Sequence, residues 1–518
     1  MSELPKGWVT TTLGELADVI RGVTYKKEQA KASSSKGLVP LLRATNISQE
    51  LDFDELVYVP ERNVSDLQML RQGDVVIAAS SGSKSVVGKA AILKSEWIGT
   101  FGAFCAAVRP NQGIAAQYLA SYMQTREYRS YISTCSAGVN INNLKASDLS
   151  SFELLLAPRP EQDRIVAEIE KQFTRLDAAT AALKRVQANL KRYRASVLKA
   201  ACEGRLVPTE AEVAREEGRD YEPAEKLLQR ILRERRARWE SDTVAKMIAA
   251  GKRPTDGRWK QKYKEPSAPD TSNLPALPEG WCWASLEQLT TLITSGSRGW
   301  GDSYSEAGPL FVRAQDIKTD SLNLDFVARV DLQTDSEGTR TRIFRNDILV
   351  TITGANVTKT ALVTLDIEEA YVSQHVGLVR PVLPQIAAYL YTWIVSPSQG
   401  RKELLRLAYG AGKPGLNLEN LRTLWVALPP IAEQIRLENE TERLLSTAIA
   451  VESNVQHQIV KTSRARNGIL QSAFTGQLVP QDPTDEPASA LLERIRAGRV
   501  ESLKKTVARR TEKKRGQR

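Results

Sequence analysis

The chain has 518 residues, 42% of them hydrophobic, and carries 72 lysines and arginines against 61 aspartates and glutamates, a formal net charge of +11. This length predicts two or more domains with packed cores, and the positive balance permits an anionic partner without identifying one. The four cysteines lack metal-ligand spacing, the first residues lack a signal-peptide core, and no apolar run is long enough to span a bilayer. We therefore expect a cytoplasmic protein with free thiols and no membrane partner.

Residues 1–158 are predicted to form a first domain. Strand-like runs at Asp74–Ala79 and Phe101–Arg109 are separated by turn-rich loops, and a helical stretch follows at Ala115–Ser130. Short apolar runs bounded by turn residues are typical of strands. The combination predicts an α+β domain with antiparallel or mixed strands.

Residues 159–208 are predicted to contain one long helix. From Glu161 to Gly204, apolar residues recur every three or four positions, and no proline or glycine interrupts the pattern. At 1.5 Å per residue the helix would be about 65 Å long. A helix of this length cannot bury its apolar stripe alone, so the pattern predicts a partner helix.

The remaining chain repeats this order. A polar connector at 209–275 contains a helical piece at 222–239 and a Lys/Pro/Asp-rich linker at 251–273 that we expect to be flexible. Residues 276–430 are predicted to form a second domain, 431–480 a second long helix, and 481–518 a helical piece with a basic, disordered tail.

Internal similarity supports this division. Glu161 and Glu433 lie 272 residues apart, as do Gly204 and Gly476, and both domains begin with Leu-Pro-x-Gly-Trp, at 4–8 and 277–281. The sequence therefore predicts a domain, a long helix and a connector, each occurring twice. We expect an α+β fold in which two similar α/β domains are joined by two long antiparallel coiled-coil helices about a pseudo-twofold axis, with the domains at opposite ends.

Catalytic patterns are missing from the sequence. His375 and His457 are the only histidines, so neither a histidine-based metal site nor a Ser-His-Asp triad is predicted. The Gly82–Lys89 segment lacks the residues of a phosphate-binding loop, and the Gly-x-Gly-x-x-Gly at 410–415 follows a helix instead of a strand. We predict no catalytic residue, metal ligand or cofactor, which favours a binding protein.

Two similar domains on a spacer suit two separated half-sites on duplex DNA. Base recognition requires Arg, Lys, Asn or Gln side chains on loops, and the repeat places four such loops in corresponding positions of each domain. For each residue the alternative is a solvated turn; His375 is equally compatible with a structural role, and Arg43 and Arg313 with structural ion pairs. The predicted DNA contacts are Arg43, Asn46, Ser83, Lys84, Lys89, Asn140, Asn142 and Lys145 in the first domain, and Arg313, Gln315, Asn356, Lys359, Gln374, His375, Lys413 and Asn417 in the second.

The chain resembles the specificity subunits of type I restriction–modification enzymes over nearly its whole length. The resemblance depends on the paired Leu-Pro-x-Gly-Trp starts, the paired Glu-Gln…Gly-x-Leu-Val-Pro helices, and the connector beginning Tyr-Glu-Pro-Ala at 221. It implies two target-recognition domains for the two halves of a split double-stranded DNA target, separated by two antiparallel helices. It also implies a non-catalytic subunit that assembles with two methyltransferase subunits and with restriction subunits. S-adenosylmethionine, ATP and Mg²⁺ would then bind those partners.

Two alternatives remain at this stage. The first is a non-catalytic scaffold whose helices organise partner proteins without recognising DNA, and the second is the recognition half of a combined restriction–methylation enzyme. A saturable preference for one split sequence over random duplex would exclude the first alternative. Separate neighbouring genes for a methyltransferase and a helicase-nuclease would speak against the second.

Overall fold

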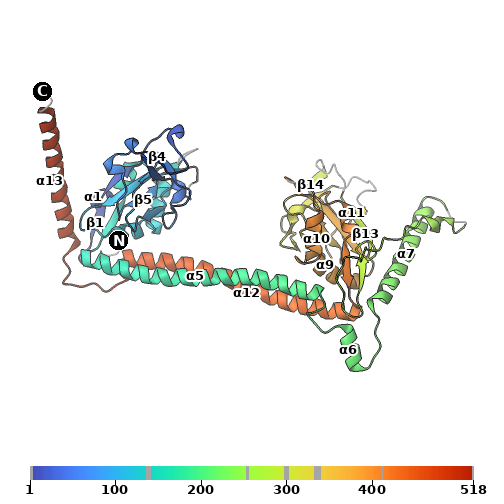
Figure 1. The fold of residues 1–518 in the computed structure, drawn as a ribbon. Coiled ribbons are helices and arrows are strands. Elements are labelled where there is room, and N and C mark those ends of the chain that lie inside the picture. The colour runs from blue at the N-terminus through green and yellow to red at the C-terminus, as the bar shows by residue number, and fades with distance from the viewer. Residues whose placement is uncertain are drawn as a thin grey trace. The chain divides into compact units, whose positions relative to one another are not determined.

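The computed structural model describes residues 4–83, 85–135, 142–252, 256–296, 303–331, 340–410 and 412–515. The chain divides into two compact units (Figure 1). Unit 1 comprises Met1–Lys184 and Gln456–Arg518, and unit 2 comprises Arg185–Val455. Within the described ranges, no helix is both long and apolar enough to cross a membrane.

Unit 1 contains a central antiparallel sheet in the order β2-β9-β5-β7 and a smaller sheet in the order β4-β3-β8. Strand β5, with the sequence Val-Val-Ile-Ala, is buried at every position, as expected for the middle of a covered sheet. The strands of the two sheets are β2 (Ala17–Arg21), β3 (Leu38–Leu42), β4 (Val57–Pro60), β5 (Val75–Ala78), β7 (Ala90–Ile92), β8 (Thr100–Phe101) and β9 (Cys105–Pro110). The shorter elements are β1 (Val9–Thr12), α1 (Leu13–Leu16), β6 (Ser80–Ser81), α2 (Ala116–Tyr122), α3 (Arg126–Cys135), β10 (Asn142–Asn143), α4 (Ala146–Ser150) and β11 (Glu153–Leu156).

Unit 2 repeats this topology. Its sheets run β13-β21-β18-β19 and β17-β14-β20, which match the two sheets of unit 1 strand for strand. The strands are β12 (Cys282–Ser285), β13 (Thr290–Ser295), β14 (Tyr304–Val312), β15 (Ile317–Lys318), β16 (Ser321–Leu322), β17 (Ala328–Val330), β18 (Ile348–Thr351), β19 (Thr360–Leu362), β20 (Ala370–Val372), β21 (Val376–Pro381) and β22 (Trp425–Leu428). The helices of unit 2 include α6 (Glu210–Glu217), α7 (Ala224–Ala249), α9 (Ala387–Val395), α10 (Gly400–Leu407) and α11 (Leu418–Arg422).

The two long helices are α5 (Arg159–Cys202) and α12 (Ile431–Phe474), each of 44 residues. Gly204 and Gly476 follow them with φ angles of +65° and +73°, the left-handed conformation in which glycine commonly ends a helix. Within unit 1, Arg466 pairs with Asp177 and Thr462 contacts Thr180, so the two helices run antiparallel there. Within unit 2, an ion pair of 2.6 Å joins Arg194 of α5 to Glu452 of α12.

A connector helix covers each domain in the same way. In unit 1, α13 (Ala488–Arg515) begins where the Ala488 amide donates to the Gly7 carbonyl at 2.8 Å. In unit 2, α7 begins where the Ala224 amide donates to the Gly280 carbonyl, also at 2.8 Å. The buried side chains Leu491, Leu492 and Ile495 join the core of unit 1, and Leu227 and Ile231 join the core of unit 2.

Both connectors contain regular structure. In the linker, whose flexibility stays a prediction, Arg258–Lys262 forms a 3-10 helix and its Trp259 stacks on Trp239 of α7 with ring centroids 6.1 Å apart. The basic tail is not without structure either, because α13 continues to Arg515. Its lysine, arginine and glutamate residues have good helix propensity, and no proline interrupts them.

Candidate nucleic-acid interface

In unit 2, three of the predicted loops meet at one end of the central sheet, beyond β18. The Ile352 amide donates to the His375 carbonyl at 2.9 Å, and the Gly354 amide donates to the Pro414 carbonyl at 2.9 Å. The fourth loop joins them through Asn356, whose Nδ2 donates to the Ala314 carbonyl at 3.2 Å. Segments scattered over more than 100 residues of sequence therefore form one surface.

Unit 1 builds the equivalent surface beyond β5. The amides of Ala79 and Ser80 both donate to the Phe104 carbonyl, at 2.9 and 3.0 Å, and the Leu144 amide donates to the Ala79 carbonyl at 2.8 Å. The Gly102 amide donates to the Leu42 carbonyl at 2.9 Å, which brings in the loop after β3. Because backbone groups make these contacts, the loops have a fixed geometry while their side chains remain available to a ligand.

The predicted contact residues differ in exposure. Asn46 is buried, and Lys84, Asn140 and the Asn142 side chain lie outside the described residues. Arg43, Lys89, Arg313, Asn356, Lys359 and His375 are partly exposed. The fully exposed ones are Ser83, Lys145, Gln315, Gln374, Lys413 and Asn417.

Several of these side chains are engaged within their own loops. The Arg313 guanidinium donates to both carboxylate oxygens of Asp316, at 3.1 and 3.2 Å. Arg313 therefore forms a structural ion pair, which was the alternative to direct DNA contact. In unit 1 the aspartate is replaced by Asn46, whose Oδ1 accepts from the Arg43 amide at 3.0 Å and whose Nδ2 donates to the Asp54 carbonyl at 3.0 Å. Asn46 therefore has a structural role in this conformation.

Two other predicted contacts also have intramolecular partners. Asn417 caps α11, because its Oδ1 accepts from the Asn420 amide at 2.8 Å. The Lys359 ammonium lies 3.8 Å from the Asp320 carboxylate. The Ser83 hydroxyl likewise lies 2.9 Å from the Ser85 hydroxyl of the same loop.

His375 and Lys413 lie close enough to interact electrostatically. Partial burial, and then the nearby Lys413 charge, lower the pKa of His375 below its usual value. The imidazole is therefore neutral at neutral pH and offers one donor and one acceptor, the combination found on base edges. Its Nε2 lies 3.3 Å from Nε2 of Gln374, so the two side chains project together.

Phe104 is a residue of this surface that the sequence did not indicate. Its side chain is 67% exposed, although its backbone is held by the two hydrogen bonds described above. A phenylalanine is ordinarily assigned to a core, and for this reason it was missed. The repeat contained the signal, because aligning 101–105 with 372–376 places Phe104 opposite His375. An exposed aromatic ring suits contact with a thymine methyl group or stacking on a base.

Each domain is attached to its long helix by a buried hydrogen bond between two repeated motifs. Trp8 Nε1 donates to Glu161 Oε2 in unit 1, and Trp281 Nε1 donates to Glu433 Oε1 in unit 2, both at 3.0 Å. Glu433 also accepts from the Glu210 amide at 2.9 Å, and burial raises its pKa to about 7. These bonds fix the orientation of each recognition surface relative to the start of its own helix.

No catalytic centre was predicted, and the described ranges contain no group of three or more His, Cys, Asp or Glu side chains placed to hold a metal ion. The loops beyond β5 and β18 thus present amide, hydroxyl, lysine and aromatic groups. Groups of these kinds contact phosphates and base edges in protein–DNA interfaces.

Comparison with known proteins agrees with this arrangement. The model of a family described as type I restriction modification DNA specificity domain matches residues 5–191. The StySPI specificity subunit of Salmonella potsdam is 29% identical over 525 residues, covering 98% of both chains. The chain is thus similar to the type I restriction enzyme specificity subunits over nearly its whole length. The EcoKI specificity subunit of Escherichia coli K12 is a further relative, 26% identical over 98% of both chains.

The family resemblance inferred from the repeats is thereby confirmed. A chain from a solved structure concerned with complex assembly and conformational transition of the type I R-M system shares the fold, with a TM-score of 0.59 at 16% identity. The similarity covers 92% of this chain and 100% of that one. The expected fold class, two α/β domains with two long helices, is confirmed as well. The family model describes a DNA specificity domain, and the relatives are named as specificity subunits of type I restriction enzymes.

Proposed function

We propose that this chain recognises a split duplex DNA target, with one domain on each half-site, and directs methyltransferase and restriction subunits to it. The observation that supports this most strongly is the repeated surface beyond β5 and β18, where the same four loops converge in both units. Equivalent frameworks with different side chains are what two different half-sites require.

The two surfaces differ where base contact is expected. In unit 1 the loop before β9 presents Phe104, whereas in unit 2 the corresponding loop presents Gln374 and His375. Phenylalanine has no hydrogen-bonding group, while glutamine and neutral histidine have both donors and acceptors. We therefore propose that the two half-sites have different sequences. The residues proposed to contact DNA include the exposed Lys145, Gln315 and Lys413.

The long helices supply the proposed spacing between the half-sites. α5 and α12 have equal length, and each carries in its first turn a glutamate hydrogen-bonded to the tryptophan of the preceding domain. Their outer faces and the connector helices α7 and α13 are the proposed docking surface for two methyltransferase subunits, with restriction subunits joining the assembly. In this proposal the chain itself holds no cofactor; S-adenosylmethionine, ATP and Mg²⁺ belong to the partners.

The test uses the full chain in its natural assembly, co-expressed with the methyltransferase subunits encoded beside it. We expect methylome sequencing of the host to show one split motif that disappears when the gene is deleted. Gln374→Ala should alter one half-site and leave the other half-site and the spacing unchanged. Lys402→Ala removes an exposed charge from α10, outside the proposed docking and base-contacting surfaces, and serves as the matched control, with no change in the motif expected.

A scaffold without DNA recognition gives a different result. The purified assembly would then bind a random duplex as tightly as any split sequence at moderate salt, and the methylome would not depend on Gln374. Either observation would contradict the proposed function.

A further inference from the structure

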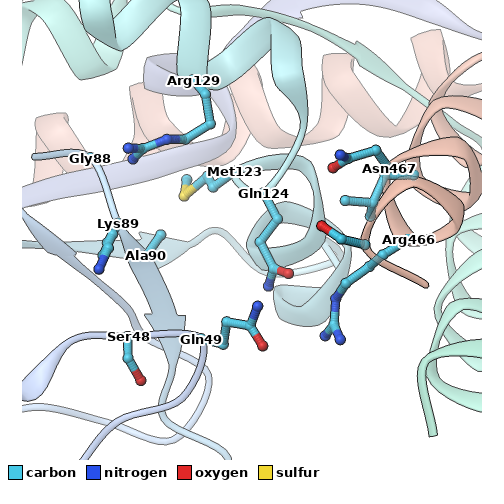
Figure 2. Close-up of a pocket in the computed structure, with 12 residues that line it drawn as sticks. Ser48, Gln49, Gly88, Lys89, Ala90, Met123, Gln124, Arg129, Arg466 and Asn467 are labelled. Carbon is cyan, nitrogen blue, oxygen red and sulfur yellow. The ribbon is translucent and has the colours of Figure 1, made fainter. Parts of the chain in front are cut away.

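A polar groove in unit 1 lies between the recognition domain and α12, outside the loop tips proposed to contact bases. Its cavity volume is about 410 Å³. One wall is formed by Gln49, Lys89 and Gln124 of the domain, and the other by Arg466 and Asn467 of α12 (Figure 2). The domain wall and the helix wall belong to the same compact unit.

The orientation of Arg466 is fixed from two sides. Its Nη1 donates to Asp177 Oδ1 of α5 at 2.7 Å, and its guanidinium carbon lies 3.8 Å from the ring centroid of Phe173. A cation held over an aromatic face and paired with one carboxylate retains further N–H groups. Its Nε is buried without a hydrogen-bond partner. Figure 2 shows the guanidinium directed into the same space as the Gln49 and Gln124 side chains.

The opposite wall is also positioned in advance. Arg129 donates through Nη1 to the Val87 carbonyl at 2.9 Å and through Nη2 to the Ser85 carbonyl at 3.2 Å, so it holds the loop that ends at Lys89. Among the described residues, the side chains of Lys89 and Gln124 have no intramolecular hydrogen bond or ion pair. The nearby Glu50 carboxylate is neutralised by Lys94 at 2.6 Å. The groove therefore gathers cationic and amide donors with their acidic neighbours already paired.

We propose that this groove binds a phosphodiester of the DNA backbone beside the half-site recognised by unit 1. A phosphate oxygen accepts several hydrogen bonds and favours Lys, Arg and amide donors together. Lys89 belongs to the loop whose other end is part of the recognition surface, and Arg466 belongs to the long helix α12. The contact would therefore fix the position of the DNA between the two half-sites relative to α12. The inference rests on the proposed function and assigns α12 a direct role in DNA binding.

The experiment measures duplex binding by the full chain with its methyltransferase subunits as a function of salt. Arg466→Gln and Lys89→Gln should each weaken binding about tenfold at low salt and reduce the slope of log K against log salt by about one. The loss should be equal on the cognate duplex and on a duplex with altered half-sites, because phosphate contacts carry no base information.

Asp177→Asn is the matched control. It breaks the same pair between α5 and α12 but leaves the Arg466 cation in the groove, so the salt slope should not change. Equal effects of Asp177→Asn and Arg466→Gln would show that Arg466 acts only through helix pairing and would overturn the inference. Arg466→Lys, which keeps the charge, should retain most of the slope and excludes misfolding as the cause.

Other outcomes separate the inference from the function on which it rests. Unchanged slopes in both groove variants, with the split-site preference intact, would overturn the groove alone. Absence of split-site preference in the unmodified assembly would overturn the proposed function. Titration with inorganic phosphate distinguishes the source of the ligand, because saturable binding that is lost in Arg466→Gln and matches duplex affinity would make this a small-phosphate site.

Discussion

The pair formed by Asp74 and Arg109 should dominate the stability of the sheet in unit 1. Arg109 donates through Nε and Nη2 to the two carboxylate oxygens of Asp74, at 2.8 and 2.6 Å, and the Asp74 and Arg109 side chains are 1% and 13% exposed. Arg109 Nη2 also donates to the Met69 carbonyl at 2.8 Å. The pair therefore joins β9 to the turn before β5 in a nearly dry environment.

Asp74→Asn leaves the arginine buried without its counter-charge. Removing one partner of a buried ion pair costs about 3–5 kcal/mol, a large part of the roughly 5–15 kcal/mol by which a domain is usually stable. Replacing both partners, as in Asp74→Asn with Arg109→Met, should cost less than the sum of the two single changes, because no unpaired charge remains.

Hydrogen exchange followed by mass spectrometry measures this locally. We expect Asp74→Asn to accelerate exchange in peptides covering β5 and β9 and to leave β18 and β21 unchanged. The equivalent pair in unit 2, Arg380 with Asp347 at 2.7 Å, provides the reciprocal control. A loss below about 1 kcal/mol, or strictly additive single changes, would refute the assigned role of the buried pair.

Three further predictions concern the buried hydrogen bond between Trp281 and Glu433, the recognition surface, and the long helices that separate the domains. Burial raises the pKa of Glu433 from 4.5 to about 7, so the folded state binds the proton more tightly than the unfolded state does. The free energy of unfolding of unit 2 should therefore fall by up to about 3 kcal/mol as pH rises through that interval. Glu433→Gln should remove this pH dependence in denaturation measured against pH. Phe104→Ala should cost about 1–3 kcal/mol of duplex binding and relax one base position in the methylome. Four residues inserted between Ala179 and Thr180, about one turn, should change the accepted spacer length while both half-sites persist.

The long helices were predictable because their evidence is local. Apolar positions recur at helical spacing along α5, and the glycine that ends the helix follows it directly in sequence. The repeated strand order followed from the internal repeat, since equal patterns at a fixed separation imply equal folds. The same repeat included Trp8 and Glu161 without showing that they form a hydrogen bond, because the two residues are 153 positions apart. The pairing of Asp74 with Arg109, 35 positions apart, was not predictable for the same reason.

The candidate surface was predictable as a set of loops but not as a set of side chains. Asn46 resembles an exposed turn residue in sequence, yet it is 4% exposed because its amide closes the loop that contains it. Phe104 differs in the opposite direction, because its backbone carbonyl accepts hydrogen bonds within the fold while its ring is exposed. Burial of a single side chain depends on neighbours distant in sequence, and the 3-10 helix of the connector depends likewise on Trp259 meeting Trp239.

The covering helix of unit 1 imposes an order on biosynthesis. Unit 2 is one continuous segment and can complete its core during translation, whereas the core of unit 1 includes Leu491, Leu492 and Ile495. The apolar face around Trp8 must therefore wait for about 300 further residues, roughly 15–60 s at ribosomal speed, before its last layer arrives. The first domain to be made is the last to finish, and a nonsense codon near the end of the gene would damage the N-terminal domain first.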